Sequence, residues 1–298
     1  MNEQNPLVSI IVITYNSSKF VLETLESAKA QTYQNIELIV SDDCSTDNTV
    51  EICRQWVEEN KERFVRTELV TAPQNTGIPA NCNRGVKAAQ GEWVKLIAGD
   101  DLLLDKCIAL NIENITKYPL IKVQLSRIKR LKNGVIFHTQ LPIGIKANFN
   151  FVNAYDQHRA LIIRYFGNTP SMFISKDIVD RISFDERFKF LEDYPFALNV
   201  TKAGFSFSFL DQETVIYRIH DDSVMNPRTD KIFSEFYKKR FEFDKIYRFP
   251  FMPKNLKRRE LFEYNRLLFL EWIGLNKNTF FNRLINSITY RMNPFLYL

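Results

Sequence analysis

Two pairs of neighbouring aspartates are the residues of this chain best suited to hold a cation or a nucleotide. Asp42-Asp43 and Asp100-Asp101 each follow a short apolar run of the kind that forms a buried strand. In an open α/β sheet, ligands bind beyond the carboxyl ends of parallel strands, so both pairs could line one site. Carboxylate oxygens suit Mg²⁺ and Mn²⁺, which commonly bridge a diphosphate to a protein. The alternative is that an aspartate pair simply opens a turn.

The turn after the first apolar run offers side chains to a ligand. No glycine precedes Gly77, which excludes a G-x-G-x-x-G or Walker A phosphate loop at this turn. A nucleotide would therefore be held by side chains: the Tyr15 ring can stack on a base, and Thr14 and Asn16 can form hydrogen bonds. Asp43 could accept a hydrogen bond from a base N–H. Alternatively, these polar residues only begin a helix and Tyr15 packs in the core.

The elements that would position these residues alternate between strand and helix. Four apolar runs are predicted strands: 7–13, 36–40, 65–70 and 93–98. Amphipathic segments between them predict helices, for which Ser17 or Ser18 and Thr46 or Asp47 are candidate caps. This alternation is typical of right-handed βαβ crossovers and predicts a Rossmann-like, mainly parallel sheet.

The pattern changes from about residue 121. The turn Asn133-Gly134 between 123–131 and 135–139 predicts a hairpin, and hence a mixed sheet. Further elements are predicted as helices over 177–181 and 193–203 and a strand over 214–219. We therefore expect an α/β domain over 1–225, divided into halves 1–101 and 102–225, and a helical extension over 226–298.

The extension is basic and rich in aromatic residues. Residues 231–298 contain 14 Lys and Arg against 6 Asp and Glu, in a chain of net charge +5. With the clusters Lys238-Lys239-Arg240 and Lys257-Arg258-Arg259, it could lie on an anionic membrane. The alternative is an amphipathic helical subdomain that packs on the α/β domain and leaves its charges solvated.

The cysteines and the hydropathy pattern indicate the compartment. Four cysteines, without C-x-x-C spacing, predict reduced thiols in a cytosolic protein. No apolar stretch approaches the roughly 20 residues that cross a bilayer, and the short polar N-terminus does not resemble a signal peptide. We expect a cytoplasmic protein, peripheral at the inner face of the membrane if the extension binds lipid, with no nucleic-acid partner.

Four segments taken together resemble family 2 glycosyltransferases over residues 7 to about 223. These are Val8-Ser9-Ile10-Ile11-Val12-Ile13-Thr14-Tyr15-Asn16, Ser41-Asp42-Asp43-Cys44-Ser45-Thr46-Asp47, Asn75-Thr76-Gly77-Ile78 and Ala98-Gly99-Asp100-Asp101. The resemblance implies a GT-A fold with a nucleotide-binding half (1–101) and an acceptor-binding half (102–225). It also implies a divalent metal, Mn²⁺ or Mg²⁺, and inverting transfer from a nucleotide-sugar, with Thr14, Asn16 and Gly77 on the donor side.

The resemblance also implies roles for individual residues. Tyr15 and Asp43 would contact the base, usually uracil, Asp100 the ribose or sugar, and Asp101 the metal. Asp193 aligns with the catalytic base, although an aspartate there could also be a helix N-cap.

Further along, His220 would approach the metal or diphosphate, with a surface-loop histidine as its alternative. Glu192, Thr169 and Ser171 would lie on the acceptor side. Cys82 departs from the family, because many relatives have Arg at this position, and this puts the identity of the donor in doubt.

The expected function is transfer of a sugar from a nucleotide-sugar, expected to be UDP-linked, to a hydroxyl of a glycan or lipid-linked saccharide in cell-surface polysaccharide synthesis. One alternative is a sugar nucleotidyltransferase, which would ordinarily need a Gly-rich basic loop after the first strand. Another is a membrane-surface scaffold that uses the basic extension.

Overall fold

The computed structural model describes residues 5–138, 153–165, 167–220 and 230–296. They form two compact units: residues 1–161 with 165–220, and residues 162–164 with 221–298. The predicted boundary between residues 225 and 226 and the last residue of the predicted hairpin, Thr139, lie outside the described residues. Each unit is considered by itself.

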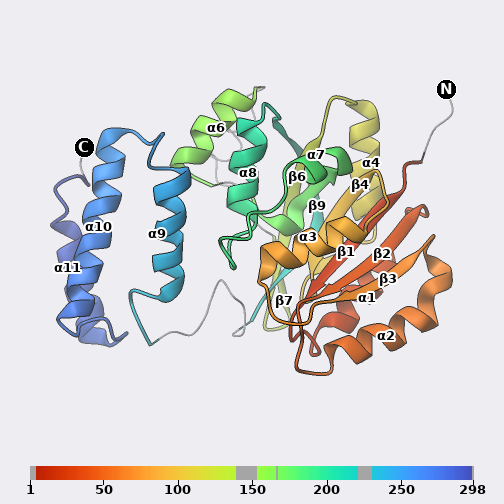
Figure 1. Cartoon of the computed structure of the whole chain (residues 1–298), viewed down its shortest axis with the longest axis horizontal. Helices are drawn as coiled ribbons and strands as arrows, with labels where there is room; N and C mark the ends of the chain where they lie inside the picture. The colour runs from red at the N-terminus through yellow and green to blue at the C-terminus, as the bar shows by residue number, and fades with distance from the viewer. Residues whose placement is uncertain (1–4, 139–152, 166, 221–229, 297–298) are drawn as a thin grey trace. The chain divides into compact units, whose positions relative to one another are not determined.

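The first unit contains a mixed sheet that is mainly parallel along its longer pairings (Figure 1). Among the described residues its strands are β1 Val8–Thr14, β2 Ile36–Asp42, β3 Thr67–Thr71, β4 Trp93–Ala98, β5 Leu102–Leu103, β6 Val123–Lys132, β7 Val135–His138, β8 Met172–Ser175 and β9 Phe207–Ile219. Their order is β3-β2-β1-β4-β8-β6-β9-β5, with β7 paired to β6. β1, β2, β3 and β4 pair in parallel, as βαβ crossovers require.

Helices cover both faces of the parallel half. The helices of this unit are α1 Val21–Lys29, α2 Thr49–Asn60, α3 Ile78–Ala88, α4 Cys107–Lys117, α6 Ala154–Ile163, α7 Lys176–Arg181 and α8 Asp193–Lys202, with short 3₁₀ turns η1 Lys61–Arg63 and η2 Thr169–Ser171. Alternate residues of β1 face opposite layers: Ile10 joins the core beside α1, whereas Ile11 faces Gly85 of α3.

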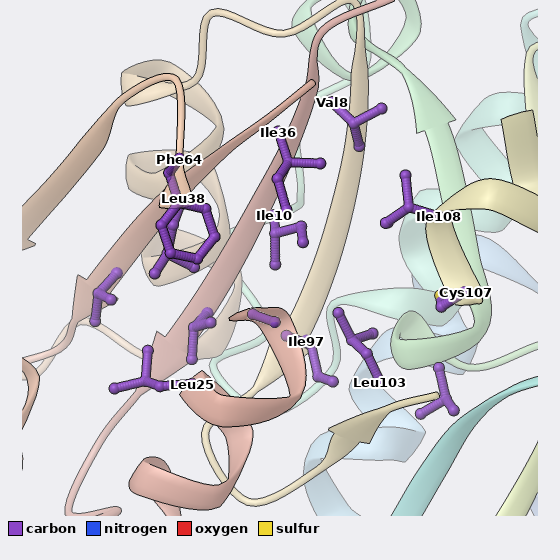
Figure 2. Close-up of a cluster of buried hydrophobic side chains, with 14 of the residues drawn as sticks. Val8, Ile10, Leu25, Ile36, Leu38, Phe64, Ile97, Leu103, Cys107 and Ile108 are labelled. Atoms are coloured by element: carbon purple, nitrogen blue, oxygen red, sulfur yellow. The ribbon is translucent and has the colours of Figure 1, made fainter. Parts of the chain in front are cut away.

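The core beside α1 is a continuous cluster of buried side chains. Figure 2 shows Ile10, Leu38 and Ile97 of neighbouring strands with Leu25 of α1 and Ile108 of α4. Because these strands are covered on both faces, their sequences are almost continuously apolar. The core therefore fixes β1, β2 and β4 at the register that determines where their carboxyl ends lie.

Two details of the prediction are wrong. α1 begins at Val21 with Phe20 at the N-cap position, so neither Ser17 nor Ser18 is its N-cap. α2 begins at Thr49 with Asn48 at the N-cap position, although Asp47 Oδ1 accepts a 3.0 Å hydrogen bond from the N–H of Thr49, the first residue of the helix. The last strand is also longer than the predicted 214–219, since β9 starts at Phe207 and pairs with β6 along its length.

The second unit consists mainly of α9 Glu235–Tyr247, α10 Lys254–Trp272 and α11 Phe280–Arg291. Ser234 caps α9 and Thr279 caps α11 by accepting a hydrogen bond from a backbone N–H of the first turn. No helix in the described part of the chain is both long and apolar enough to cross a bilayer.

Candidate active site at the carboxyl ends of the strands

The register of the parallel strands brings the predicted donor-side residues to one edge of the sheet. Thr14 pairs with Asp42 on β2, and Ile13 pairs with Ala98 on β4, so these strands end level with one another. The Thr14 hydroxyl donates to Asp42 Oδ2 over 2.8 Å. Tyr15, Asp43 and Asp100 therefore follow strand ends at the same edge of the sheet, and their sharing of one site stays a prediction.

The turn after β1 is fixed by the loop after β2. Asn16 has φ +50°, and its side-chain oxygen accepts a 2.8 Å hydrogen bond from the Thr46 N–H. Its own N–H donates to the Ser45 hydroxyl over 2.8 Å. Tyr15 is 48% exposed, so it does not pack in the core. The turn thus exposes the Tyr15 ring to solvent, while hydrogen bonds to Ser45 and Thr46 hold its backbone in place.

Asp43 is buried and bonded by the protein itself. Its carboxylate accepts hydrogen bonds from the N–H groups of Thr76 (3.0 Å) and Gly77 (2.7 Å), and from Arg84 Nη2 (3.1 Å). Burial opposes ionisation, but these bonds outweigh it, and the pKa of Asp43 lies below its ordinary value. Asp43 therefore anchors the turn that opens α3, and its contact with a base stays a prediction.

Gly77 permits that turn. Its φ is +96°, and a Cβ would lie 2.9 Å from Cβ of Lys189, whose carbonyl accepts from the Ile78 N–H. Any other residue would be strained there.

Asp100 and Asp101 meet the end of β9. His220 Nε2 lies 2.9 Å from Asp100 Oδ2, and the Arg218 N–H donates to Asp101 Oδ1 over 2.8 Å. The Arg218 side chain also donates to the Asp100 carbonyl, and its guanidinium lies 4.5 Å from the Phe20 ring centroid. His220 is thus brought to the aspartate pair from a strand more than a hundred residues later in the chain.

Asp101 is the member of this pair that lacks internal compensation. It is 1% exposed, and its Oδ2 is buried without a hydrogen-bond partner. Burial and the neighbouring carboxylate of Asp100 raise the pKa of Asp101 well above its ordinary value. A cation could bind this oxygen, but among the described residues no group of three or more His, Cys, Asp or Glu side chains is placed to hold a metal ion.

Glu192 and Asp193 lie at the start of α8. Glu192 is at the N-cap position without a side-chain capping bond, and Asp193 is the first helical residue, so Asp193 is not the N-cap. Glu192 accepts from the Thr169 hydroxyl over 2.8 Å. Burial and the charge of Asp193 raise the pKa of Glu192 to about 8. The predicted acceptor residue Ser171 is buried, and its hydroxyl donates to the Asn168 carbonyl.

Electrostatic coupling connects these groups into one region. Burial and the carboxylates of Asp101, Asp100 and Glu192 raise the pKa of Tyr217 to about 12. The Cys82 thiol, fully buried, has its pKa raised by burial and by Glu192, Asp193 and Asp43. The predicted donor, metal and base residues thus act on shared neighbours. The four cysteines are free thiols, as predicted.

Three basic residues of the region were not predicted as site residues. Arg84 binds Asp43, Arg218 binds the Asp100-Asp101 segment, and the fully buried Lys95 donates from Nζ to the Pro170 carbonyl over 2.6 Å. Lys95 interrupts an otherwise apolar strand, which was an available signal. Lys95 thereby fixes the segment that carries Thr169.

Known proteins resemble this chain in sequence and in fold. The chain is 38% identical to the glycosyltransferase GlyG of Streptococcus pneumoniae over 34% of its length and 33% of that protein. It is 25% identical to the minor teichoic acid biosynthesis protein GgaB of Bacillus subtilis, over 78% of this chain and 25% of that protein. The chain therefore spans a third or less of these two relatives.

Among solved structures, S. aureus TarS 1–349 in complex with UDP-GlcNAc matches 88% of this chain and 72% of its own, with TM-score 0.62 and 23% identity. The mannosyltransferase PcManGT from Pyrobaculum calidifontis, in complex with GDP-Man and Mn²⁺, matches 73% and 58%, with TM-score 0.54 and 20% identity. These likenesses confirm the predicted GT-A-like α/β fold.

A family model described as Glycosyl transferase family 2 matches residues 9–183, which is more than half of the chain. The match contains the turn after β1, both aspartate pairs and the acceptor-side turn η2. This chain therefore belongs to glycosyl transferase family 2, as its motifs predicted.

Proposed function

We propose that this enzyme transfers a sugar from a UDP-sugar to a hydroxyl group of a glycan or lipid-linked saccharide, with inversion at the anomeric carbon. The observation that carries the proposal is the register that ends β1, β2 and β4 at one edge of the sheet, where His220 Nε2 lies 2.9 Å from Asp100 Oδ2. The UDP-GlcNAc complex of the TarS neighbour supports a UDP-linked donor. The relatedness to GgaB supports a role in cell-surface polymer synthesis.

In this proposal the donor lies between the Tyr15 ring and the turn held by Asp43. The uracil base stacks on Tyr15 and is bordered by Thr14 and Asn16, while Asp100 contacts the ribose or sugar. Residues 1–101 form the nucleotide-binding half and residues 102–225 the acceptor-binding half, with 226–298 as an extension. Nucleotide recognition by side chains agrees with the glycine-free turn after β1.

Asp101 and His220 would hold Mn²⁺ or Mg²⁺. The partnerless buried oxygen of Asp101 and the Mn²⁺ of the PcManGT complex support this assignment. A bound metal would neutralise negative charge on the departing diphosphate. His220, which already lies 2.9 Å from Asp100, would hold the two aspartates and the diphosphate in one place.

Asp193 is the proposed general base. Burial and the charge of Asp193 raise the pKa of Glu192 to about 8, and we assign the proton-accepting role to Asp193, the other carboxylate of the pair. As the acceptor oxygen forms its bond to the anomeric carbon, its proton moves to Asp193 and the bond to the diphosphate oxygen breaks. Thr169 orients Glu192 beside the base.

Replacing Asp193 by asparagine tests the role of the base. Asp193→Asn should lower the rate of sugar transfer about 10²–10⁴-fold, while UDP binding measured by titration calorimetry stays unchanged. Asp180→Asn, which alters a half-exposed carboxylate on α7, is the matched control. Unchanged turnover of Asp193→Asn would remove the assignment.

The donor is identified by screening nucleotide-sugars for metal-dependent hydrolysis. The sugar nucleotidyltransferase alternative makes a different product, because a nucleoside triphosphate and a sugar phosphate would release pyrophosphate. Family membership favours the glycosyltransferase. We further propose that the enzyme works on the cytoplasmic face of the membrane, where the basic extension attaches it.

A further inference from the structure

Helix α11 is amphipathic, and its apolar side faces solvent. Phe280, Phe281, Leu284 and Ile288 are 78%, 64%, 49% and 54% exposed, respectively. Their spacing places them on one side of the helix. We call these four residues the α11 face.

The opposite side of α11 is polar and packs on α10, beside which it lies in Figure 1. Arg266 of α10 donates from Nη2 to Asn286 Oδ1 over 2.8 Å and from Nη1 to the Thr289 hydroxyl over 2.6 Å. The Asn293 side chain, just beyond α11, donates to the Arg259 carbonyl. A helix that used its apolar side for folding would be oriented the other way, so the α11 face is left for another partner.

The carboxyl end of α10 adds more exposed apolar surface. Phe269 is 55% exposed and Trp272 is 80% exposed, and their ring centroids lie 5.9 Å apart. Tryptophan and phenylalanine are favoured where an apolar slab meets water, as at the headgroup region of a bilayer.

The charged residues that follow Glu271 in the sequence all have one sign. No Asp or Glu follows Glu271, whereas Lys277, Arg283 and Arg291 are exposed. The basic clusters that the sequence highlighted are partly occupied inside the unit: Lys238 pairs with Glu271, and Arg259 with Glu260. The part of the extension best suited to an anionic partner is therefore α11.

We infer that the α11 face, together with Phe269 and Trp272, docks on a lipid bilayer that contains anionic lipids. The apolar side chains would enter the boundary between headgroups and acyl chains, and Arg283 and Arg291 would contact lipid phosphates. A second copy of this chain is a poorer partner, because a two-fold contact would bring the same cations together without carboxylates. The inference rests on the proposed membrane location, and it is independent of the donor sugar.

Vesicle co-sedimentation of the full chain tests the inference. The wild type should sediment with phosphatidylcholine vesicles that contain phosphatidylglycerol and much less with pure phosphatidylcholine. Leu284→Gln/Ile288→Gln should lower the affinity at least about tenfold, and Arg283→Gln/Arg291→Gln should lower it about fivefold per arginine at low salt.

The controls separate docking from folding and from catalysis. Leu120→Gln/Val65→Gln removes two apolar side chains that are 95% and 63% exposed elsewhere, and it should bind vesicles like the wild type. All variants should bind UDP equally in solution, so a failure of the proposed donor site would appear separately. The inference would be overturned if the wild type did not sediment with anionic vesicles. It would also be overturned if Leu284→Gln/Ile288→Gln bound these vesicles as tightly as the wild type. A dimer in sedimentation velocity that this variant dissociates, without vesicle binding, would overturn it in favour of a second copy.

Discussion

Asp43 and Asp101 follow β2 and β4, the two strands that flank β1 in one sheet, but their carboxylates have opposite environments. Asp43 receives hydrogen bonds from Thr76, Gly77 and Arg84, and its pKa is lowered despite burial. Asp101 has one oxygen without a partner, and burial beside Asp100 raises its pKa. Hydrogen bonds within the protein offset the cost of burying the Asp43 carboxylate. The Asp101 carboxylate has an oxygen that only a bound ligand, such as a cation, could pair with.

The comparison assigns different tasks to residues that look alike in the sequence. A compensated carboxylate stabilises the folded chain and holds a loop in place, whereas an uncompensated one costs stability until a cation binds. Glu192 belongs with Asp101 in this respect, because burial and Asp193 raise its pKa. Substitutions at these positions should therefore separate stability from activity.

The largest effect is expected at Asp101. Asp101→Asn should lower the rate of transfer with Mn²⁺ about 10³-fold, or about 4 kcal/mol in the transition-state free energy, because the proposed metal ligand is lost. The same substitution should leave the metal-free protein equally stable or more stable, because it removes a buried repulsion with Asp100. Thermal unfolding without metal and initial rates with Mn²⁺ measure the two effects.

Asp105→Asn is the control for Asp101→Asn, because Asp105 is an exposed aspartate four residues further on. Asp105→Asn should change neither the initial rate of transfer nor the midpoint of thermal unfolding. A destabilised Asp101→Asn protein would mean that Asp101, like Asp43, is compensated by the fold.

Asp43 should show the reverse behaviour. Asp43→Asn should lower the free energy of unfolding by about 3 kcal/mol at pH 7, because an amide group would face donors that now meet a carboxylate. Since the folded-state pKa of Asp43 is lowered, its contribution is present above the ordinary value near 4 and is lost as the pH falls through the folded value. Urea unfolding of the wild type and of Asp43→Asn at pH 7 and below pH 4 measures the destabilisation and its pH dependence. The difference in the free energy of unfolding between the two proteins should be smaller at the lower pH. An undiminished stability difference at the lower pH would contradict the role of the ionised Asp43 carboxylate in stabilising the fold.

The fold was largely predictable because it depends on patterns within short segments. Continuous apolar runs mark strands covered on both faces, and Asn133-Gly134 joins β6 to β7 with positive φ at both residues. Strands β5 and β8 and the first half of β9 were not predicted from the sequence. β5 has two residues and β8 has four, and the first half of β9 alternates aromatic and serine residues and then turns polar, so none of them carries enough local pattern.

Only those site residues that follow a strand or belong to a motif could be predicted from the sequence. The carboxylates could be located because each follows a strand, but their partners come from distant parts of the chain. Arg84 is 41 residues from Asp43, Lys95 is 75 from Pro170, and Arg218 is 117 from Asp101. Only tertiary structure determines such contacts, and they decide which carboxylate is compensated.

The smallest of the expected effects is at Glu192, where the comparison predicts a pH dependence. A folded-state pKa of about 8, against 4.5 for the free group, means that the folded protein holds this proton more tightly than the unfolded chain does. The free energy of unfolding therefore falls as the pH rises between these two values.

Glu192→Gln keeps an oxygen that can accept a hydrogen bond from Thr169, but its side chain cannot ionise. Its stability advantage over the wild type should grow through this window and level off above about pH 8. Thermal midpoints of both proteins from pH 5 to pH 9 provide the measurement, and Glu186→Gln, a change outside the carboxyl pair, should show no such trend. A constant difference at every pH would mean that Glu192 is ionised in the folded enzyme, and it would place Glu192 with Asp43 among the compensated carboxylates.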